Sequence, residues 1–217
     1  MKIVSVKSLS ALLLVAFSAV NLSACDMEMP TIANTGVEVP NYNSYKALRL
    51  PANKISKSKS VALAKKQGQR FDVMPEMVLG VMTQESGFNA NAVSYVGAQG
   101  LMQIMPTTLT HIKAKSGLKV SDPFDPVQNS AAGTWYLRSL YDELEGVSTS
   151  NRWRFALASY NGGIGRVQNA IKKAQQLSKK SRAEVTWTDI KNYLPRETRN
   201  YVPAVVGHTA YYRTQSL

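Results

Sequence analysis

The sequence predicts a mainly α-helical domain. Apolar residues recur at helical spacing in several stretches, and these stretches are bounded by residues that favour the starts and ends of helices. The sequence shows no strand pattern of any length and no internal repeat. Its 217 residues are enough for one domain with a sizeable hydrophobic core and additions to it.

The clearest helical pattern lies in residues 74–106. Pro75 suits the first turn of a helix and Gly87 suits its exit. From Met74 to Glu85 runs a stripe of side chains at helical spacing, apolar except for Glu85 at its end. The apolar members are Met74, Met77, Val78, Val81 and Met82. A helix that buries this stripe carries Glu85 to the edge of the core.

Such a position changes the acid–base chemistry of Glu85. A desolvated carboxyl group disfavours its charged form, so its pKa should rise. The negative end of the helix dipole also discourages ionisation in the last turn. A carboxylic acid that is still protonated near neutral pH can donate a proton to a leaving group. A single glutamate at a helix end is more often an ordinary solvated residue, so this assignment depends on the motifs around it.

Similar signals predict helices elsewhere in the chain. Candidate N-caps are Ser60, Asp125 and Asn151, because a short polar side chain can accept a hydrogen bond from the first turn. Pro106 can start a short helix that Gly117 ends. These residues divide the central part of the chain into several helices of ordinary length.

The C-terminal part is also expected to be helical. Helices are predicted from about residue 164 into a basic stretch, over residues 187–194 and over residues 197–212. Pro203 lies within the last of these, which predicts a late start or a kink. The one expected exception to helix is a small β-hairpin near residues 94–100.

Four short motifs occur in order, and together they are far more specific than any one of them. They are QES at residues 84–86, SYVGAQGLMQIMP at 94–106, ASYNGG at 158–163 and PRETRNYV at 195–202. In these motifs the chain resembles the catalytic domain of the soluble lytic transglycosylases, over roughly residues 60–212. The resemblance implies a lysozyme-like fold.

The resemblance also implies a reaction. A peptidoglycan lytic transglycosylase cleaves the β-1,4 bond between N-acetylmuramic acid and N-acetylglucosamine and leaves 1,6-anhydromuramic acid ends. Glu85 would first protonate the glycosidic oxygen and then take the proton from the muramoyl 6-hydroxyl. The acetamido group of the substrate can stabilise the cation, which is a known exception to the two-carboxylate rule.

By the same resemblance, a set of residues lines the substrate site. Tyr201 would hydrogen-bond near Glu85, and Gln103 and Asn161 could hold N-acetyl groups. The implied substrate-binding residues are Ser94, Met102, Gln103, Tyr160, Asn161, Glu197 and Tyr201. Simpler interpretations stay open for some of them: Met102 as core filler rather than a residue that packs on a sugar, and Tyr201 as a core aromatic.

The acidic residues of the sequence are compatible with more than one function. Most of the 14 acidic residues lie in polar or capping positions, which leaves Glu85 and Glu197 as the candidates for a site. Glu197 can equally be a first-turn residue that the helix dipole stabilises. One alternative is a hydrolytic muramidase that activates water with Glu197 or Asp122. A second is a wall-binding protein without catalysis.

The N-terminus predicts export. Lys2 and Lys7 precede the short apolar run 9–20, and residues 22–25 resemble a lipobox that ends at Cys25. We therefore expect a lipoprotein signal peptide at 1–24, lipid on Cys25, a linker at 25–58 and the catalytic domain at 59–217. The alternative is an ordinary signal with Cys25 as an idle thiol. Asp26 hints at the inner membrane, but the choice between membranes stays open.

Charge and motif content limit the partners. The chain carries 26 Lys and Arg against 14 Asp and Glu, a net charge of +12. For an exported protein this favours peptidoglycan strands and membrane surfaces over nucleic acid. His111 and His208 lack metal-ligand spacing, and there is no phosphate loop, dinucleotide turn or serine elbow, so no cofactor is expected. Protein partners are not indicated.

Overall fold

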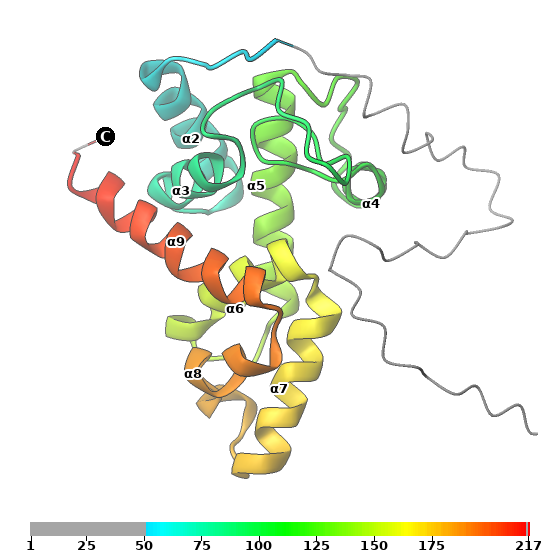
Figure 1. Cartoon of the computed structure of the whole chain (residues 1–217), viewed down its shortest axis with the longest axis vertical. Coiled ribbons are helices and arrows are strands. Elements are labelled where there is room, and N and C mark those ends of the chain that lie inside the picture. Colours follow the sequence, from blue (N-terminus) through cyan, green and yellow to red (C-terminus); the bar gives the residue numbers. More distant parts are fainter. Residues whose placement is uncertain (1–50, 216) are drawn as a thin grey trace, which may run out of the picture. The chain divides into compact units, whose positions relative to one another are not determined.

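The structure, a computed structural model, describes residues 51–215 and residue 217 (Figure 1). The predicted signal peptide, Cys25 and most of the predicted linker lie outside these residues. The described part is a helical domain, as predicted. Its helices are α2 (Lys57–Phe71), α3 (Pro75–Ser86), α4 (Pro106–Ser116), α5 (Pro126–Glu143), α6 (Thr149–Gly162), α7 (Ile164–Ser178), α8 (Trp187–Ile190) and α9 (Arg196–Arg213), with 3-10 turns η1 (Arg182–Glu184) and η2 (Lys191–Tyr193).

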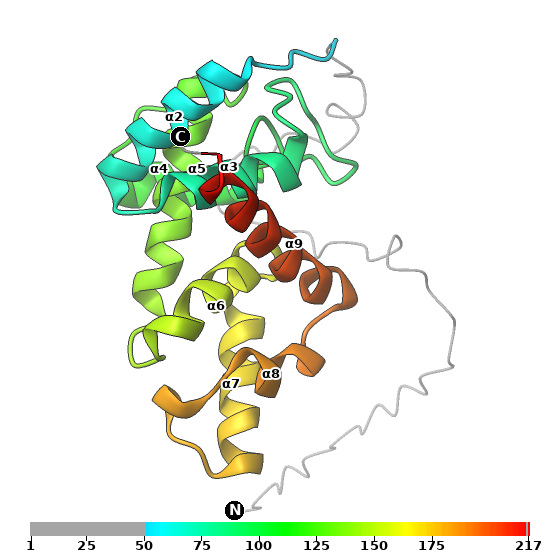
Figure 2. The same ribbon diagram turned by 90° about the vertical axis from the view of Figure 1, so that its left-hand side faces the viewer.

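Helix α9 joins the two ends of the helical assembly. The C-terminal half of α9 crosses α3, and the start of α9 packs against α6 (Figures 1 and 2). Helix α5 contacts α2 and α6, and α6 in turn packs on α7. Segments far apart in the sequence, α3 and α9, are therefore brought together where the candidate acid lies.

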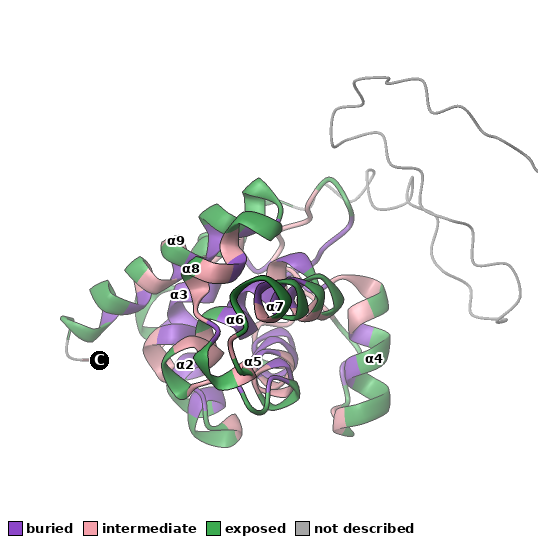
Figure 3. Cartoon of the chain, turned by 90° about the horizontal axis from the view of Figure 1, so that it is seen from below, coloured by how far each residue is buried: buried purple, intermediate pink, exposed green. Residues whose placement is uncertain are grey.

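The predicted apolar stripe forms part of the core. Met77, Val78, Val81 and Met82 of α3 are all at most 4% exposed. Buried residues gather on the inner sides of the helices, and the outer sides of α4 and α9 are exposed (Figure 3). Glu85, at the end of the stripe, is half-buried. The stripe is therefore buried as predicted, but Leu79, which lies outside it, is also only 1% exposed, so α3 is covered on more than this one face.

Several predicted helix boundaries are confirmed. Pro75 occupies the first position of α3, and Gly87 ends the helix with φ +55°, a conformation that glycine adopts without strain. Pro106 starts α4 and Gly117 follows its last residue. Asp125 caps α5, and its Oδ1 accepts a hydrogen bond of 2.8 Å from the Gln128 amide.

Two predicted caps are wrong. Ser56, not Ser60, caps α2 and accepts a hydrogen bond from the Lys59 amide, while Ser60 is a buried residue inside the helix. Asn151 lies inside α6, which begins after Ser148. The side chain of Asn151 instead accepts a hydrogen bond of 3.0 Å from the amide of Trp187, so it secures α8 rather than its own helix.

Other predicted boundaries also shift. Pro203 lies within α9, which is continuous from Arg196, so the late start is wrong. Because Pro203 lies beyond the first turn, its missing amide costs the helix one internal hydrogen bond. The expected helix at 187–194 ends at Ile190 and continues as η2. Residues 51–55, expected in the linker, hydrogen-bond to residues 88–91, and the expected domain start at residue 59 falls inside α2.

The expected β-hairpin is reduced to single bridges. Gln99 forms antiparallel bridges with Val93 and with Ile104. Within the described part of the chain, pairing does not extend beyond isolated bridges of this kind. The loop between α3 and α4 is therefore held by individual hydrogen bonds. Among the described residues, no helix is both long and apolar enough to cross a membrane.

A glycine allows the close approach of α3 and α9. A Cβ at Gly80 would lie 2.9 Å from Thr209 Oγ1 and 3.1 Å from the Val205 carbonyl oxygen. We predict that Gly80→Ala destabilises the domain by about 1 to 2 kcal/mol, because overpacking outweighs the gain in helix propensity. Chemical denaturation measures this loss.

The matched control is Gly207→Ala on α9, the other helix of this pair, where a new Cβ meets nothing within 4 Å. It should leave stability unchanged or raise it by up to about 1 kcal/mol. Equal stabilities of the two variants would contradict the assignment of Gly80 to the helix contact.

Candidate active site

The candidate site is centred on Glu85, the penultimate residue of α3. The hydroxyl of Tyr201, on α9, donates a hydrogen bond of 2.6 Å to Glu85 Oε1 across a separation of 116 residues. Tyr201 itself is only 5% exposed, which restricts its ring to one position. The structure thus contains the contact between Tyr201 and Glu85 that the sequence resemblance implied.

The environment of Glu85 raises its pKa from 4.5 to about 7. Desolvation is the main cause, because loss of water disfavours the carboxylate. The hydrogen bond from Tyr201 lowers the pKa and so opposes burial, whereas the negative charge of Glu197 raises it further. The carboxyl group of Glu85 is therefore present in both protonation states near neutral pH.

Two tyrosines supply neutral hydroxyl groups beside this acid. Burial, with the charge of Glu85, raises the pKa of Tyr160 and of Tyr201 well above the ordinary value. The hydroxyl of Tyr160 donates a hydrogen bond of 2.8 Å to the Met102 carbonyl oxygen. Its ring lies 5.6 Å, centroid to centroid, from that of Tyr136 on α5. Tyr160 thus connects α6 to the loop that follows α3.

Asn161 and Glu197 form a second polar group. Asn161 Nδ2 donates a hydrogen bond of 3.1 Å to Glu197 Oε1, and the hydroxyl of Thr198 donates one of 2.8 Å to Asn161 Oδ1. A Cβ at Gly162 would lie 2.7 Å from Thr198 Oγ1, so this glycine lets α6 and α9 meet there. Glu197 is exposed, and its negative charge acts on Glu85.

Ser94 and Gln103 shape the loop between α3 and α4. Ser94 Oγ accepts a hydrogen bond of 2.9 Å from the Ala98 amide. Gln103 has φ +45°, and its Nε2 donates to the carbonyl oxygens of Ala92, at 3.0 Å, and Gly100, at 2.9 Å. With its amide nitrogen occupied by the loop, Gln103 has its amide oxygen left to offer a ligand.

The expectation that Met102 packs on a sugar is corrected by the structure. Met102 is fully buried, and its side chain packs so closely on Gly133 that a Cβ there would lie 2.6 Å from Met102 Sδ. Met102 is a core residue that contributes its backbone carbonyl to Tyr160. Met105, which the sequence analysis did not select, is the methionine of this loop that keeps exposed surface.

Two further residues that the sequence analysis missed hold the loop in place. Asn129, on α5 and 1% exposed, accepts a hydrogen bond of 2.8 Å from the Met102 amide. It also donates to the carbonyl oxygens of Gln99, at 3.0 Å, and Pro123, at 2.7 Å. Ser86 Oγ donates a hydrogen bond of 2.8 Å to the Leu101 carbonyl oxygen, which ties the loop to the end of α3.

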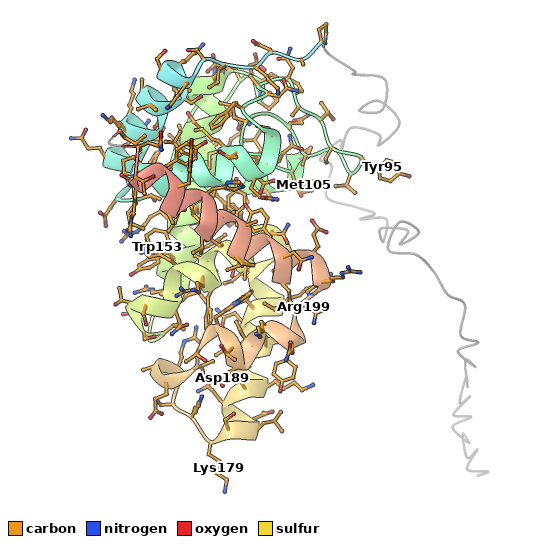
Figure 4. The ribbon with its side chains drawn as sticks, turned by 60° about the vertical axis from the view of Figure 1, so that its left-hand side comes forward. Tyr95, Met105, Trp153, Lys179, Asp189 and Arg199 are labelled. Atoms are coloured by element: carbon orange, nitrogen blue, oxygen red, sulfur yellow. The ribbon has the colours of Figure 1, made fainter. Side chains whose placement is uncertain are left out.

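The tip of this loop points outward. Tyr95 and Val96 are 65% and 59% exposed, and Tyr95 extends away from the helices (Figure 4). The base of the loop is fixed by Asn129, Ser86 and Tyr160, so the polar side chains near Glu85 are set by the helices around them.

Removal of the Tyr201 hydroxyl tests the electrostatics of the site. The hydrogen bond from Tyr201 stabilises the carboxylate, so Tyr201→Phe should raise the pKa of Glu85 above about 7. NMR titration of the Glu85 carboxyl carbon measures this pKa directly, and the pH midpoint of any activity that depends on Glu85 should move the same way.

Tyr212→Phe is the matched control. Tyr212 is also on α9, is 9% exposed and shares a hydrogen bond of 2.9 Å with Thr83 of α3. This variant removes a comparable buried hydroxyl group, but one that makes no hydrogen bond to Glu85. The pKa of Glu85 should therefore stay at its wild-type value. An equal pKa shift in both variants would contradict the role given to Tyr201.

These features define a helical domain in which the half-buried acid Glu85, near the C-terminal end of α3, accepts a hydrogen bond from a buried tyrosine. The chain belongs to the transglycosylase SLT domain family, whose model matches residues 62–183, over half of the chain. The match ends before α9, which carries Glu197 and Tyr201. The family and the solved structures below confirm the predicted mainly α, lysozyme-like fold.

Several curated relatives share one name. The chain is 38% identical over 133 residues to membrane-bound lytic murein transglycosylase C of Actinobacillus pleuropneumoniae. This match covers 57% of this chain and 36% of the relative. It is also 38% identical over 116 residues to the protein of that name from Haemophilus influenzae, covering 50% and 32%. The matched region therefore spans about a third of the length of these relatives.

Solved structures show the same domain within larger proteins. The 70 kDa soluble lytic transglycosylase of Escherichia coli is 30% identical, with a TM-score of 0.59, and the match covers 71% of this chain and 24% of that one. An inactive variant of the lytic transglycosylase Slt from Pseudomonas aeruginosa is 26% identical with the same TM-score and coverage.

Proposed function

We propose that this chain is a peptidoglycan lytic transglycosylase. It cleaves the β-1,4 bond between N-acetylmuramic acid and N-acetylglucosamine and forms 1,6-anhydromuramic acid ends. The observation that carries the proposal is the state of Glu85: a half-buried carboxyl group with a pKa of about 7, held by the hydroxyl of Tyr201. Membership of the SLT family and the names of the relatives support the same reaction.

The proposed mechanism uses Glu85 twice. The protonated carboxyl group donates its proton to the glycosidic oxygen as the bond to the anomeric carbon breaks. The resulting carboxylate then accepts the proton of the muramoyl 6-hydroxyl, whose oxygen closes on the anomeric carbon. A pKa near neutrality suits both steps, because neither protonation state is then strongly disfavoured.

The surrounding residues have separate tasks in this scheme. Tyr201 holds the carboxyl group in one orientation and limits how far its pKa can rise. We propose that Ser94, Gln103, Tyr160, Asn161 and Glu197 bind the glycan, and that Met105 takes the apolar sugar contact first expected of Met102. The free oxygen of Gln103 suits the N–H of an N-acetyl group.

A hydrolytic muramidase remains the second candidate, because the charge of Glu197 reaches Glu85. A hydrolase requires a carboxylate that activates water. Asp122 is a weaker candidate for this task, since its Oδ1 accepts a hydrogen bond of 2.8 Å from the Phe124 amide in a local turn.

Product analysis decides between the two reactions. Purified sacculi are digested in water enriched in oxygen-18, and the released muropeptides are analysed by mass spectrometry. A transglycosylase gives anhydro ends one water lighter than reducing ends and without the label. Labelled reducing ends as the main product would refute the proposed reaction and support the hydrolase.

We further propose that the protein is anchored in the bacterial cell envelope, on the periplasmic side, by lipid on Cys25. The proposal rests on the sequence of residues 1–25, and the relatives are named membrane-bound. Cys25→Ser, in a chain whose residues 1–24 are replaced by a signal peptide that is cleaved without lipidation, should move the protein from salt-washed membranes to the soluble fraction, because the lipid that anchored it is lost.

The salt wash is the essential control, because a chain of net charge +12 can also adhere to anionic membranes. Mass analysis of the wild-type N-terminal peptide should show the attached lipid. Retention of Cys25→Ser in washed membranes at the wild-type level would contradict the anchor.

A further inference from the structure

A pocket of about 610 Å³ lies between α7 and the segment that leads into α9. Helix α7 contributes Arg166, Asn169 and Lys173 to its lining, and the segment contributes Asn192, Tyr193 and Pro195. The proposed mechanism makes no use of this pocket.

The pocket has an uncompensated positive charge. None of its lining residues is acidic, and neither Arg166 nor Lys173 has a carboxylate partner in the described part of the chain. Arg166 Nη1 donates a hydrogen bond of 3.0 Å to the Gly162 carbonyl oxygen, and Lys173 Nζ lies 4.6 Å from the centre of the Tyr193 ring. Both cations are thus positioned without being neutralised, which favours an anionic ligand.

Residues of the pocket lining lie close in the sequence to residues of the candidate site. Arg166 is bonded to Gly162, the residue after Asn161, and Gly162 packs against Thr198. On the other side, Pro195 comes two residues before Glu197. Part of the pocket lining therefore lies within five residues of the Asn161–Glu197 pair along the chain, which is near enough for one extended ligand to reach both.

We infer that this pocket binds the carboxylates of the peptide stems that peptidoglycan strands carry. The inference rests on the proposed function, because it extends the same substrate beyond the sugars at Glu85. A guanidinium and an ammonium group suit carboxylates, and the Tyr193 ring, 40% exposed, offers a face for the apolar part of a stem. The stem would thereby position the strand without taking part in bond cleavage.

The test compares strands with free stem carboxylates and strands whose stem carboxylates have been converted to amides. Wild-type protein should show a KM about five- to tenfold lower on the untreated strands, at similar kcat, as expected for a charge contact outside the reacting centre. The Arg166→Ala/Lys173→Ala variant should lose this preference. Its KM on untreated strands should rise to the KM that wild-type protein shows on amidated strands. Added salt should reduce the wild-type preference.

Arg154→Ala/Lys172→Ala is the matched control. It also removes one arginine and one lysine, but neither of them lines the pocket. Like Arg166, Arg154 donates a hydrogen bond to a backbone carbonyl oxygen four residues earlier, that of Ser150, at 2.9 Å. This variant should keep the preference. Thermal melting of both variants establishes that they are folded.

The outcomes separate this inference from the proposed function. If wild type releases no anhydro product from either substrate, the proposed reaction fails. If it releases anhydro product with equal KM from both substrates, or if the pocket variant keeps the preference, only the pocket assignment is overturned. Loss of binding to phosphatidylglycerol vesicles by the pocket variant, with an unchanged substrate preference, would also overturn it and assign the pocket to membrane headgroups.

Discussion

Glu85→Gln is expected to abolish the clearing of sacculi while leaving their binding intact. Glutamine preserves the shape of the side chain and can still accept the hydrogen bond from Tyr201, but it can neither donate nor accept the reacting proton. Because Glu85 is proposed to serve as both acid and base, activity should fall by at least about 1,000-fold. Turbidity loss of sacculi measures clearing, and co-sedimentation measures binding.

The same substitution should change the pH dependence of stability. Glu85 has a folded pKa of about 7 against an ordinary 4.5, so its contribution to stability is fully present below about pH 4.5 and is lost as pH rises through 7. The shift corresponds to at most about 3 kcal/mol. Urea denaturation at pH 5 and pH 8 should therefore show a smaller loss of stability in Glu85→Gln than in wild type.

Glu76→Gln supplies the control for both measurements. Glu76 is in the first turn of the same helix, at the end away from Glu85, so clearing should stay near the wild-type rate and the pH dependence should remain. Unchanged clearing by Glu85→Gln would refute its catalytic assignment. Binding without clearing by the wild-type protein would instead support the wall-binding alternative.

Asn129→Ala is expected to have the largest effect on stability among the residues that position the site. The substitution leaves the Met102 amide and the carbonyl oxygens of Gln99 and Pro123 without their partner, in a place that is 1% exposed. Unsatisfied buried groups should cost roughly 3 kcal/mol in total, which is about 6 to 12 °C in Tm for a domain of this size. Calorimetry measures the change.

Activity should fall as well, because the released loop carries Ser94 and Gln103. The effect should appear mainly in KM at a temperature where the variant is folded, since the Glu85–Tyr201 pair lies outside the loop. Asn200→Ala, an exposed position on α9, is the stability control and should stay within about 0.5 kcal/mol of wild type. A Tm for Asn129→Ala equal to that of the control would contradict the anchoring role.

The helices could be predicted where local chemistry decides them. Pro75 and Gly87 bound α3, and Asp125 caps α5, because each signal acts within one or two turns. Asn151 is the instructive failure. It has the chemistry of a cap, but its oxygen accepts from Trp187, 36 residues away, and the sequence alone gives no measure of such a contact.

The site was predictable to a similar extent. The periodicity that buries Met82 also desolvates Glu85, so the raised pKa follows from sequence. The choice between Met102 and Met105 does not, because in an irregular loop the buried side chain depends on tertiary packing. Asn129 was not predicted for the same reason. The sequence around an asparagine in a helix does not indicate that its side chain hydrogen-bonds to a distant loop.

The crossing of α3 and α9 has a consequence for biosynthesis. The carboxyl group and the tyrosine that orients it are made 116 residues apart, and α9 is the last helix of the described chain. Until the ribosome has completed α9, Glu85 lacks its hydroxyl partner Tyr201 and the packing of α9 on α3. A nascent or prematurely terminated polypeptide that lacks α9 should therefore be unable to attack glycan, so any activity must wait until α9 has been made and has packed on α3.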